Sequence, residues 1–596
     1  MDNSNHQSAW SKSLSMKEQR RIVMRLVKFA TRFKWYFFIS IILAAGVSVV
    51  NILLPRLIQI YMDQHLRVGD STLNMMWFFA GLYFFGMLMK AIMQFWQTYL
   101  YSMGAEYMLE SVRRNIFKKL HGLGMRYFDQ TPGGSILSRL TNDTMSFSNF
   151  WALFSSLILV IFGVISSFIA MFLVDRKIAL WLLILMPFLI LSIWYYQKYS
   201  SVVYRRMRER LSELNAKLAE SITGVSVIQQ FRQEGRIESE FEQTNGRYFD
   251  TRKAMIRVNS LLLSPIIDLL YGLATVVALS MFGIRGLHGY VAAGVIYAFV
   301  TYIDNFFNPM TGMMDNLSDF QDGIVAGSRV LKLLDDPTAE PQQNPQKGLK
   351  IQKGEIEFQH VSFSYDGKNE ILHDISFKAK AGQTIALVGE TGSGKTSIIN
   401  VLMRFYEFGT GKILLDGQDI RTFPIAELRR RMGLVLQEPF MFYGTIASNI
   451  RMFNPEISDH QIRKAARFVQ ADRFIERLPK GYDNRVFERG LSYSSGQRQL
   501  ISYARVIVTD PKILILDEAT ANIDTETEQM IQEGLEKIQE GRTTIAIAHR
   551  LSTIQNADLI LVLEHGNIVE RGTNNELMAK KGYYYDMIQL QGRTSN

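Results

Sequence analysis

Six long apolar stretches in the first half of the chain constrain its fold more than any other feature. A helix needs about 20 predominantly apolar residues to cross a bilayer. The stretches therefore predict six membrane-spanning helices. The alternative for the fourth stretch, a buried helix of a soluble domain, is disfavoured by the presence of the other five. The predicted spans are Trp35–Ile60, Leu73–Tyr99, Phe150–Val174, Ile178–Tyr196, Leu261–Ile284 and Val291–Met314.

The composition excludes several classes of protein. Hydrophobic residues make up 47% of the 596 residues and aromatic residues 12%, which argues against a disordered or collagen-like chain. The sequence has no cysteine, so disulfides, thiolate metal sites and a cysteine nucleophile are excluded. A formal charge of +10 suits either a nucleic-acid binder or a membrane protein with basic cytoplasmic segments. The apolar stretches favour the membrane protein, and no nucleic-acid partner is expected.

The distribution of basic residues predicts the orientation in the membrane. The segments after the second and fourth stretches are rich in Lys and Arg, whereas the turns after the other stretches are short and carry few. Basic residues favour the cytoplasmic side, so a multi-pass protein with both termini in the cytoplasm is predicted. The segment Lys17–Lys34 mixes basic and apolar residues. It suits an amphipathic helix on the inner membrane surface or a plain solvated helix, and both remain open.

The spacing of the stretches predicts the domain organisation. Residues 100–149 and 197–260 form two helix-rich inserts, with turns at Asp129–Gly134 and Gly224. Each insert suits two helices reaching about 35 Å beyond the membrane and back, either as an arm that contacts a soluble domain or as a surface extension. A Pro- and Gln-rich run after Asp336 predicts a linker. We expect a cytoplasmic segment with an amphipathic elbow helix (1–34), an all-α six-helix transmembrane domain (35–330), a linker (331–352) and an α/β P-loop nucleotide-binding domain (353–596).

The second half of the chain contains a phosphate-binding loop. The apolar strand Ile385–Val388 runs directly into Gly389-Glu390-Thr391-Gly392-Ser393-Gly394-Lys395-Thr396, and helical spacing follows. Glycines allow backbone N–H groups to close around phosphates, and a helix N-terminus adds partial positive charge. Lys395 is expected to reach the β- and γ-phosphates, and Thr396 to offer its hydroxyl to Mg²⁺.

Two further strands end in polar residues. Ile513–Leu516 ends in Asp517 and Glu518, where we expect Asp517 to hold Mg²⁺ and Glu518 to polarise the attacking water. Thr544–Ala548 ends in His549, which is interpreted as a γ-phosphate sensor. A solvated acidic pair or a structural histidine is the alternative when either motif stands alone.

At this point the residues resemble the ATP-binding cassette (ABC) superfamily, and nearly the whole chain resembles its bacterial exporter half-transporters of the type IV fold. Gln437 matches the glutamine loop, Tyr365 the aromatic that stacks on adenine, Tyr493–Gln497 the signature and Asp524 the aspartate loop. The resemblance implies ATP and Mg²⁺ as cofactors, with each ATP between the phosphate loop of one half and the signature of the other. The implied catalytic residues are Glu518, His549, Gln437 and Lys395, and the implied metal ligands are Thr396, Gln437 and Asp517. The implied nucleotide contacts are Tyr365, Gly389, Glu390, Thr391, Gly392, Ser393, Gly394, Lys395, Thr396, Ser397, Gln437, Asp517, Ser494, Gly496, Gln497 and Asp524.

The signature departs from the family's Leu-Ser-Gly-Gly-Gln at its first and third positions, Tyr493 and Ser495. A serine adds a Cβ where backbone must approach phosphate, so the site built on this signature is expected to hydrolyse ATP poorly. Glu518 is intact. The pattern partly resembles the subunit of heterodimeric multidrug exporters that keeps a sound acidic strand. We therefore expect a different half-transporter as partner, with a homodimer that tolerates Ser495 as the alternative.

The membrane half gives weaker evidence about the substrate. Its many aromatic and Met residues suit varied hydrophobic small molecules, although helix packing explains most single positions. Asp304 and Asn305 in the sixth stretch and Asp268 in the fifth are candidates for contact with cationic substrates, because carboxylates within a membrane usually face a cavity or a partner. Asp268 also suits a headgroup position near a span end. Export of hydrophobic or cationic drugs across the bacterial cytoplasmic membrane is the expected function, and a lipid or lipopeptide flippase is the alternative.

Overall fold

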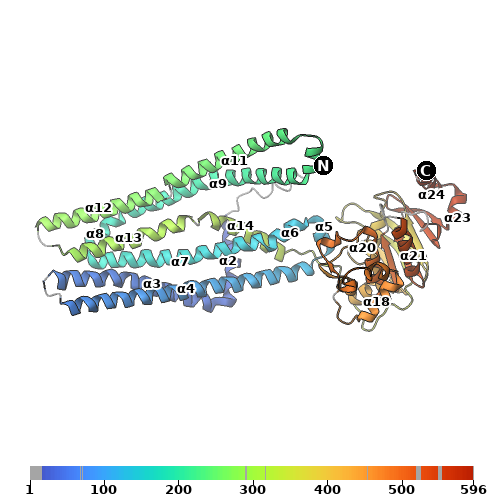
Figure 1. The fold of residues 1–596 in the computed structure, drawn as a ribbon, viewed down its shortest axis with the longest axis horizontal. Helices are drawn as coiled ribbons and strands as arrows, with labels where there is room; N and C mark the ends of the chain where they lie inside the picture. Colours follow the sequence, from blue (N-terminus) through green and yellow to red (C-terminus); the bar gives the residue numbers. More distant parts are fainter. Residues whose placement is uncertain are drawn as a thin grey trace. The chain divides into compact units, whose positions relative to one another are not determined.

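The computed structural model describes residues 16–67, 69, 72–262, 264–288, 291–315, 317–452, 454–517, 525–547 and 554–594 (Figure 1). The chain divides into two compact units. The helical unit comprises Met1–His121 and Gly133–Asp336, and the sheet unit comprises Gly122–Pro132 and Pro337–Asn596. Each unit has its own core, and each is described by itself below.

The helical unit consists of helices, several of them much longer than a membrane span. Within the described residues its α-helices are α2 (Met16–Ala30), α3 (Lys34–Ile60), α4 (Leu73–His121), α6 (Gly133–Leu140), α7 (Asn142–Val174), α8 (Arg176–Leu183), α9 (Leu185–Thr223), α10 (Val225–Gln230), α11 (Glu234–Leu262), α12 (Ser264–His288), α13 (Ala293–Asp315) and α14 (Leu317–Leu334).

Five helical segments of the described chain are long and apolar enough to cross a membrane: Lys17–Leu66, Leu73–His121, Gly133–Val174, Arg176–Thr223 and Glu234–Leu287. They contain the first five predicted spans. The sixth prediction, Val291–Met314, largely coincides with helix α13, which is not among the five apolar segments of the described chain. Asp304, Asn305 and Asn308 dilute its apolar character.

The packing of α13 gives the physical reason for this difference. Phe299, Tyr302 and Ile303 are each at most 1% exposed, and the Tyr302 hydroxyl donates to the Ile52 carbonyl of α3 at 2.9 Å. Helices α3, α7 and α12 contact α13. A helix surrounded by other helices offers little surface to lipid, so it tolerates polar residues that a lipid-facing helix does not.

The fourth predicted span is interrupted in the structure. Helix α8 ends at Leu183 and α9 begins at Leu185, with Pro187 in the first turn of α9. Proline lacks the N–H that continues a helix but is tolerated in a first turn. The break therefore falls where the sequence permits a new helix to start.

The amphipathic segment predicted at Lys17–Lys34 is helical as α2. Its Leu26 is 1% exposed and packs on α14, where a Cβ added to Gly327 would lie 2.7 Å from Leu26 Cδ1. Arg25 donates to Asp335 Oδ1 at 2.7 Å and also contacts Oδ2, and this pairing lowers the pKa of Asp335. One face of α2 is therefore fixed against the helical unit.

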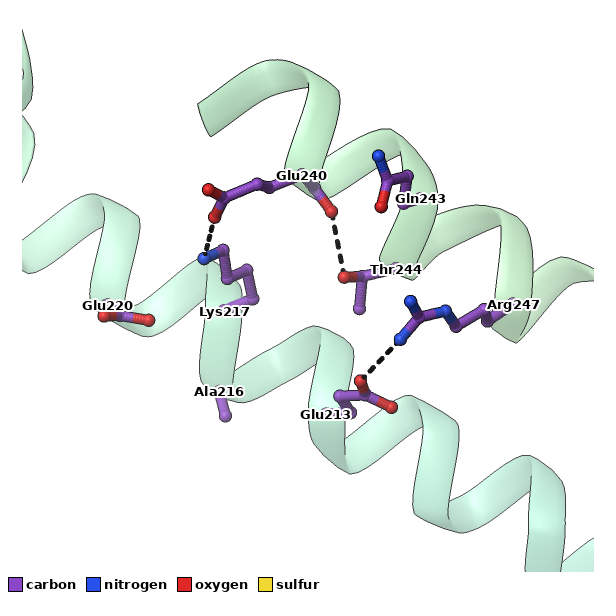
Figure 2. A pocket seen from close by; sticks show the side chains of 8 residues that line it. All are labelled: Glu213, Ala216, Lys217, Glu220, Glu240, Gln243, Thr244 and Arg247. Atoms are coloured by element: carbon purple, nitrogen blue, oxygen red, sulfur yellow. Dashed lines mark hydrogen bonds and ion pairs between the residues drawn. The ribbon is translucent and has the colours of Figure 1, made fainter. Parts of the chain in front are cut away.

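Helices α9 and α11 lie side by side as a long hairpin, with Gly224 capping α9 at its end (Figure 1). A cleft of about 390 Å³ lies between them. Figure 2 shows the side chains that line it, among which two ion pairs of opposite direction join the helices. Lys217 Nζ lies 2.6 Å from Glu240 Oε2, and Arg247 Nη1 lies 3.4 Å from Glu213 Oε1. The pairing raises the pKa of Lys217 and lowers the pKa of Glu240. Charge pairs of this kind add directional specificity to a hairpin that has few buried apolar contacts.

The sheet unit contains two main sheets. One is the mixed sheet β12-β11-β3-β10-β9-β6, in which the inner pairings are parallel, and the other is the antiparallel sheet β2-β1-β4-β5. Its strands are β1 (Ile356–Phe363), β2 (Leu372–Ala379), β3 (Thr384–Val388), β4 (Thr410–Leu415), β5 (Gln418–Asp419), β6 (Met432–Val435), β7 (Gly444–Thr445), β8 (Arg485–Val486), β9 (Ile513–Asp517), β10 (Thr543–Ile547), β11 (Leu559–Glu564) and β12 (Asn567–Gly572). Its α-helices are α5 (Met125–Gln130), α15 (Lys395–Leu402), α16 (Ile425–Arg431), α17 (Ile446–Arg451), α18 (Asp459–Phe468), α19 (Asp472–Ile475), α20 (Ser495–Ile507), α21 (Thr525–Gln539), α23 (Asn574–Lys580) and α24 (Tyr583–Thr594).

The central strands of the mixed sheet are buried on both faces. All five residues of β10 are buried, as are four of the five residues in each of β3 and β9. Parallel strands covered on both faces are expected to be continuous runs of Ile, Leu and Val. The α/β fold class expected from the sequence is therefore confirmed.

Helix α14 lies against α7 at a glycine. A Cβ added to Gly323 would come within 2.5 Å of Phe150 Cβ and 3.2 Å of the Ser146 carbonyl oxygen. We expect Gly323→Ala to lower the free energy of unfolding by about 1–3 kcal/mol, because the packed helices must shift apart. Gly283→Ala on α12 is the control, since a Cβ there meets nothing within 4 Å. Thermal unfolding of the two purified variants in detergent measures the difference, and equal midpoints would contradict this packing.

Candidate nucleotide site

The site candidates of the sheet unit gather at one edge of the mixed sheet. The register pairs Leu387 of β3 with Ile547 of β10, and Ile547 with Asp517 of β9. Val435 of β6 pairs with Leu516, so Gln437 follows β6 at the level just beyond Asp517. Because these strands are parallel, their carboxyl ends meet at the same edge, which is where α/β sheets bind ligands.

The structure describes only part of the predicted set. Glu518, His549 and Asp524 lie outside the described residues. Asp517 is described as the last residue of β9, and Gln437 as an exposed residue after β6. Of the predicted site, the phosphate loop, Asp517 and Gln437 are therefore described at the edge of the sheet.

The phosphate loop requires glycine at two positions, because of the backbone angle and because of a close neighbour. Gly394 has φ of 102°, and a Cβ there would lie 2.8 Å from Leu372 Cδ2. Gly389 has φ of 151°, and its Cβ would lie 2.2 Å from the Leu563 carbonyl oxygen. Residues with a side chain rarely adopt these backbone angles. The loop therefore passes close to β11 and β2 in a path that only glycine follows without strain.

Lys395 lies inside this loop. Its Nζ donates to the carbonyl oxygens of Gly389 and Glu390, each at 2.7 Å, and the residue is 7% exposed. Burial lowers the pKa of Lys395, and the charge of Asp517 acts in the opposite direction. Among the described residues Lys395 forms no ion pair, so the direct partners of this buried cation at the start of α15 are carbonyl oxygens. This arrangement suits an anion, because a helix N-terminus adds further positive potential.

The other loop residues follow from the start of α15. Thr396 is exposed in its first turn, whereas Ser393 and Ser397 are buried. Glu390, Thr391 and Gly392 form the turn that precedes them. Thr396 is thus accessible to a ligand from outside the loop.

Tyr365 is held beside the loop by hydrogen bonds to its hydroxyl. Ser397 Oγ lies 3.1 Å from that oxygen, and Asn400 Nδ2 donates to it at 2.9 Å. The ring packs edge-to-face on Phe363 and on Tyr406, with centroids 4.6 and 4.8 Å away. The aromatic side chain is therefore fixed near the first turn of α15.

Tyr406 and Asn400 were missed by the sequence analysis. The Tyr406 hydroxyl donates to Asp129 of α5, and burial together with this bond raises the pKa of Tyr406. The Gly124 N–H also donates to the Thr338 carbonyl at 3.4 Å, so α5 packs within the sheet unit. No motif spacing pointed to either residue, because their roles come from contacts between segments far apart in the sequence.

The signature segment forms the start of α20. Ser494 caps the helix: its Oγ accepts from the Gln497 N–H at 3.2 Å, and its own N–H donates to Gln497 Oε1 at 3.1 Å. Ser494 and Ser495 are exposed, whereas Gly496 is buried. In the described part of this single chain, no hydrogen bond or ion pair joins Ser494–Gln497 to the phosphate loop.

Tyr493, the unusual first residue of the signature, is 5% exposed. Its hydroxyl accepts from Asn484 Nδ2 at 2.7 Å and donates to the Arg485 carbonyl at 3.2 Å. Arg498 in turn donates to the Tyr493 carbonyl at 2.7 Å. The departure from leucine thus brings a polar tether between the signature and β8.

The three substrate candidates have different environments in the helical unit. Asn305 lines a cavity, and Lys90 lines the same cavity. Asp304 does not line it and accepts from Asn308 Nδ2 at 2.8 Å. Asp268 is exposed on α12. Lys90 was not among the predicted residues, although a lone cation within the second apolar stretch is a signal for such a site.

The tether at Tyr493 gives a testable expectation. We expect Tyr493→Phe to destabilise the sheet unit by about 1–3 kcal/mol, because Asn484 and Arg485 lose a buried partner. Tyr443→Phe is the control, since that ring is 71% exposed and makes no hydroxyl hydrogen bond within the described chain. Hydrogen exchange over residues 484–497 should rise in the first variant alone, and unchanged exchange in both would contradict the tether.

Comparisons with known proteins agree over both units. The model of the ABC transporter transmembrane region matches residues 37–310, and the ABC transporter model matches residues 372–521. The putative ABC transporter ATP-binding protein exp8 of Streptococcus pneumoniae is 44% identical over 577 residues, which are 96% of this chain and 98% of that protein. The probable multidrug resistance ABC transporter ATP-binding/permease protein YheH of Bacillus subtilis is 41% identical, over 85% of this chain and 75% of that protein.

A third relative has a different named substrate. The fatty acid ABC transporter ATP-binding/permease protein of Mycobacterium tuberculosis is 36% identical, over 84% of this chain and 79% of that protein. The two family models thus match the two halves of this chain, and all three relatives align with most of it. The chain belongs to the bacterial ABC exporters, as a half-transporter whose transmembrane region precedes an ATP-hydrolysing domain.

Proposed function

We propose that this chain is one half of a dimeric exporter that uses ATP and Mg²⁺ to move hydrophobic or amphiphilic molecules across the bacterial cytoplasmic membrane. The observation that carries the proposal is the buried Lys395 in a glycine loop at the sheet edge beside Asp517, in a chain whose described part also has five apolar helical segments. Both termini are proposed to lie in the cytoplasm, as the basic segments predict.

The residues at the sheet edge fit ATP and Mg²⁺. Bound there, the nucleotide with its metal supplies the free energy of phosphoanhydride hydrolysis. Lys395 would hold phosphate oxygens, and Tyr365 would stack on the adenine. The metal would be held by Thr396, Asp517 and Gln437. Glu518 would take up the proton of the attacking water, and His549 would stabilise the γ-phosphate.

A second half is needed to complete the site. Ser494 and Gly496 lie at the N-terminus of α20, where N–H groups and the helix dipole attract anions. The exposed position of Ser494 supports a role in which this helix start closes over the nucleotide of a facing half. The two halves would shut on ATP and part after hydrolysis, since the products no longer bridge them.

The chain connectivity supports coupling between ATP hydrolysis and the helices. Helix α5 packs within the sheet unit, yet it lies between α4 and α6, which belong to the helical unit. A displacement of the sheet unit would therefore pull on two helices through short connections. We propose that this converts an inward-facing cavity to an outward-facing one.

Two substrate classes remain candidates. Export of hydrophobic or cationic drugs is supported by the name of the Bacillus subtilis relative. A lipid or lipopeptide flippase is supported by the fatty acid relative and by Lys90, which adds positive charge beside Asn305 where a cationic drug was expected to bind.

Transport in vesicles tests the function. The purified complex, reconstituted in vesicles, is expected to translocate substrate only with ATP and Mg²⁺. Glu518→Gln should abolish turnover while it keeps ATP binding, because it removes the proposed base without removing a phosphate ligand. Stimulation of ATPase activity by cationic dyes would favour the drug class, and stimulation by defined lipids the lipid class. Full hydrolysis by Glu518→Gln would contradict the assigned role.

The composition of the dimer is tested through Ser495, which lies at the first position of α20. If this signature forms an impaired site in a heterodimer, the chain purified alone should have little ATPase activity, and a tagged chain should co-purify with a different half-transporter. Ser495→Gly should then raise ATPase activity of the complex, because it removes the Cβ nearest the phosphates. Ser494→Gly serves as the control, since it leaves Ser495 in place and removes the helix cap. Full substrate-stimulated ATPase activity of the unmodified chain alone would contradict the heterodimer.

A further inference from the structure

The helical unit holds a polar cavity of about 230 Å³ between α3, α4, α7 and α13. Its wall is unusual for helices that are otherwise apolar. The polar side chains used in the argument below are Asn51, Lys90, Gln94, Ser167, Asn305 and Asn308. Such a concentration of polar groups within a membrane-spanning bundle is costly and usually functional.

Lys90 is the only charged residue that lines this cavity in the described structure. It lies 17 residues after Leu73, the first residue of α4, which corresponds to about 25 Å of helix. A hydrocarbon core is about 30 Å thick, so the ammonium group belongs to the membrane-spanning part of the helix. Among the described residues Lys90 makes no ion pair and no hydrogen bond. Its positive charge is therefore not neutralised within this chain.

The amides of the cavity are also unsatisfied. Asn51, Gln94 and Asn305 line it and make no side-chain hydrogen bond within the described chain, whereas Asn308 donates to Asp304. Their NH₂ groups are donors that suit a negatively charged oxygen. The buried hydroxyl of Ser167 supplies a further donor.

Two prolines leave backbone carbonyl groups of the cavity-lining helices without their usual helical hydrogen bond. Asn51 lies four residues before Pro55 of α3, and Asn305 lies four residues before Pro309 of α13. Proline has no N–H, so the carbonyl four residues earlier loses its usual helical donor. These carbonyls can hold water beside the ammonium of Lys90, which makes a hydrated polar site more favourable than a dry one.

An apolar surface adjoins the cavity along α4. Val47 and Leu159 line the cavity itself, and Met87, one helical turn before Lys90, is 43% exposed. A ligand that fits both features has a small polar head and an apolar tail. Since the head would face an unpaired ammonium and several amide donors, its charge should be negative.

We propose that this cavity binds the anionic headgroup of a single-chain amphiphile, a carboxylate or a phosphate, through Lys90 with the amides of Asn51, Gln94 and Asn305. The proposal rests on the proposed function, since it treats the helical unit as the part that carries substrate. It names the substrate class at that site. Lys90 is the residue that distinguishes an anion from a neutral head of the same size.

Binding to the full-length complex in nanodiscs tests the proposal. Four probes with the same sixteen-carbon chain are compared: the fatty acid, the alkyl phosphate, the alcohol and the amine. Lys90→Met should weaken binding of the fatty acid or the alkyl phosphate about tenfold or more, the loss expected for a charge-assisted hydrogen bond. Binding of the alcohol should be unchanged, and Lys90→Arg should restore most of the anion affinity. The comparison of the fatty acid with the alkyl phosphate decides between carboxylate and phosphate.

Lys118→Met is the matched control, because Lys118 is an exposed lysine on the same helix, far from the cavity. It should leave all four affinities unchanged. Equal loss of acid and alcohol binding in Lys90→Met, or tighter binding of the amine than of the acid by the unmodified complex, would overturn the proposal.

Assembly of the two halves in the Lys90 variants is a separate readout. If Lys90→Met prevents co-purification of the two halves while Lys90→Arg permits it, then Lys90 pairs with an acidic residue across the dimer and the headgroup site is overturned. ATP-driven transport by the unmodified complex is measured independently. Lys90-dependent anion binding without transport would refute the exporter function and leave the site, whereas transport without such binding would refute the site alone.

Discussion

The position of the Lys395 ammonium depends on the parallel pairing of β3, β10 and β9. This register brings the loop after Val388 level with Asp517. The close approach of Gly389 to β11 and of Gly394 to β2 then folds the loop back around the lysine side chain. A buried cation would be unfavourable in such a place without compensating groups. Two loop carbonyls compensate it in this chain, and anionic phosphate oxygens suit the same position.

The helical unit also contains polar groups in surroundings that are mostly apolar. Helix α13, which contacts α3, α7 and α12, carries Asp304, Asn305 and Asn308 within about one turn. Tyr302 satisfies a carbonyl of α3, and Asn308 satisfies Asp304. The groups that remain line one cavity with Lys90. Packing thus separates the polar groups that stabilise the bundle from those that are available to a ligand.

The turns of the two predicted inserts are fixed by different kinds of contact. Helix α5 belongs to the sheet unit through Gly124 and Asp129, and Tyr406 connects it to the aromatic cluster around Tyr365. The hairpin of α9 and α11 is crossed by ion pairs in opposite directions. Paired charges favour a fixed register over a loose association of two helices.

The sequence by itself determined the classes of the two units, the strands that carry the phosphate loop and Asp517, and the first five apolar spans. These features follow from local patterns: long apolar runs, short Ile- and Leu-rich strands, and glycines at fixed spacing. Only the tertiary structure decided that α13 is surrounded by other helices and that α5 packs within the sheet unit. It also decided that Lys90 and Asn305 line one cavity and that Tyr493 is tethered to β8. Each of these depends on contacts between segments far apart in the chain, and neither periodicity nor motif spacing encodes which side chains meet there.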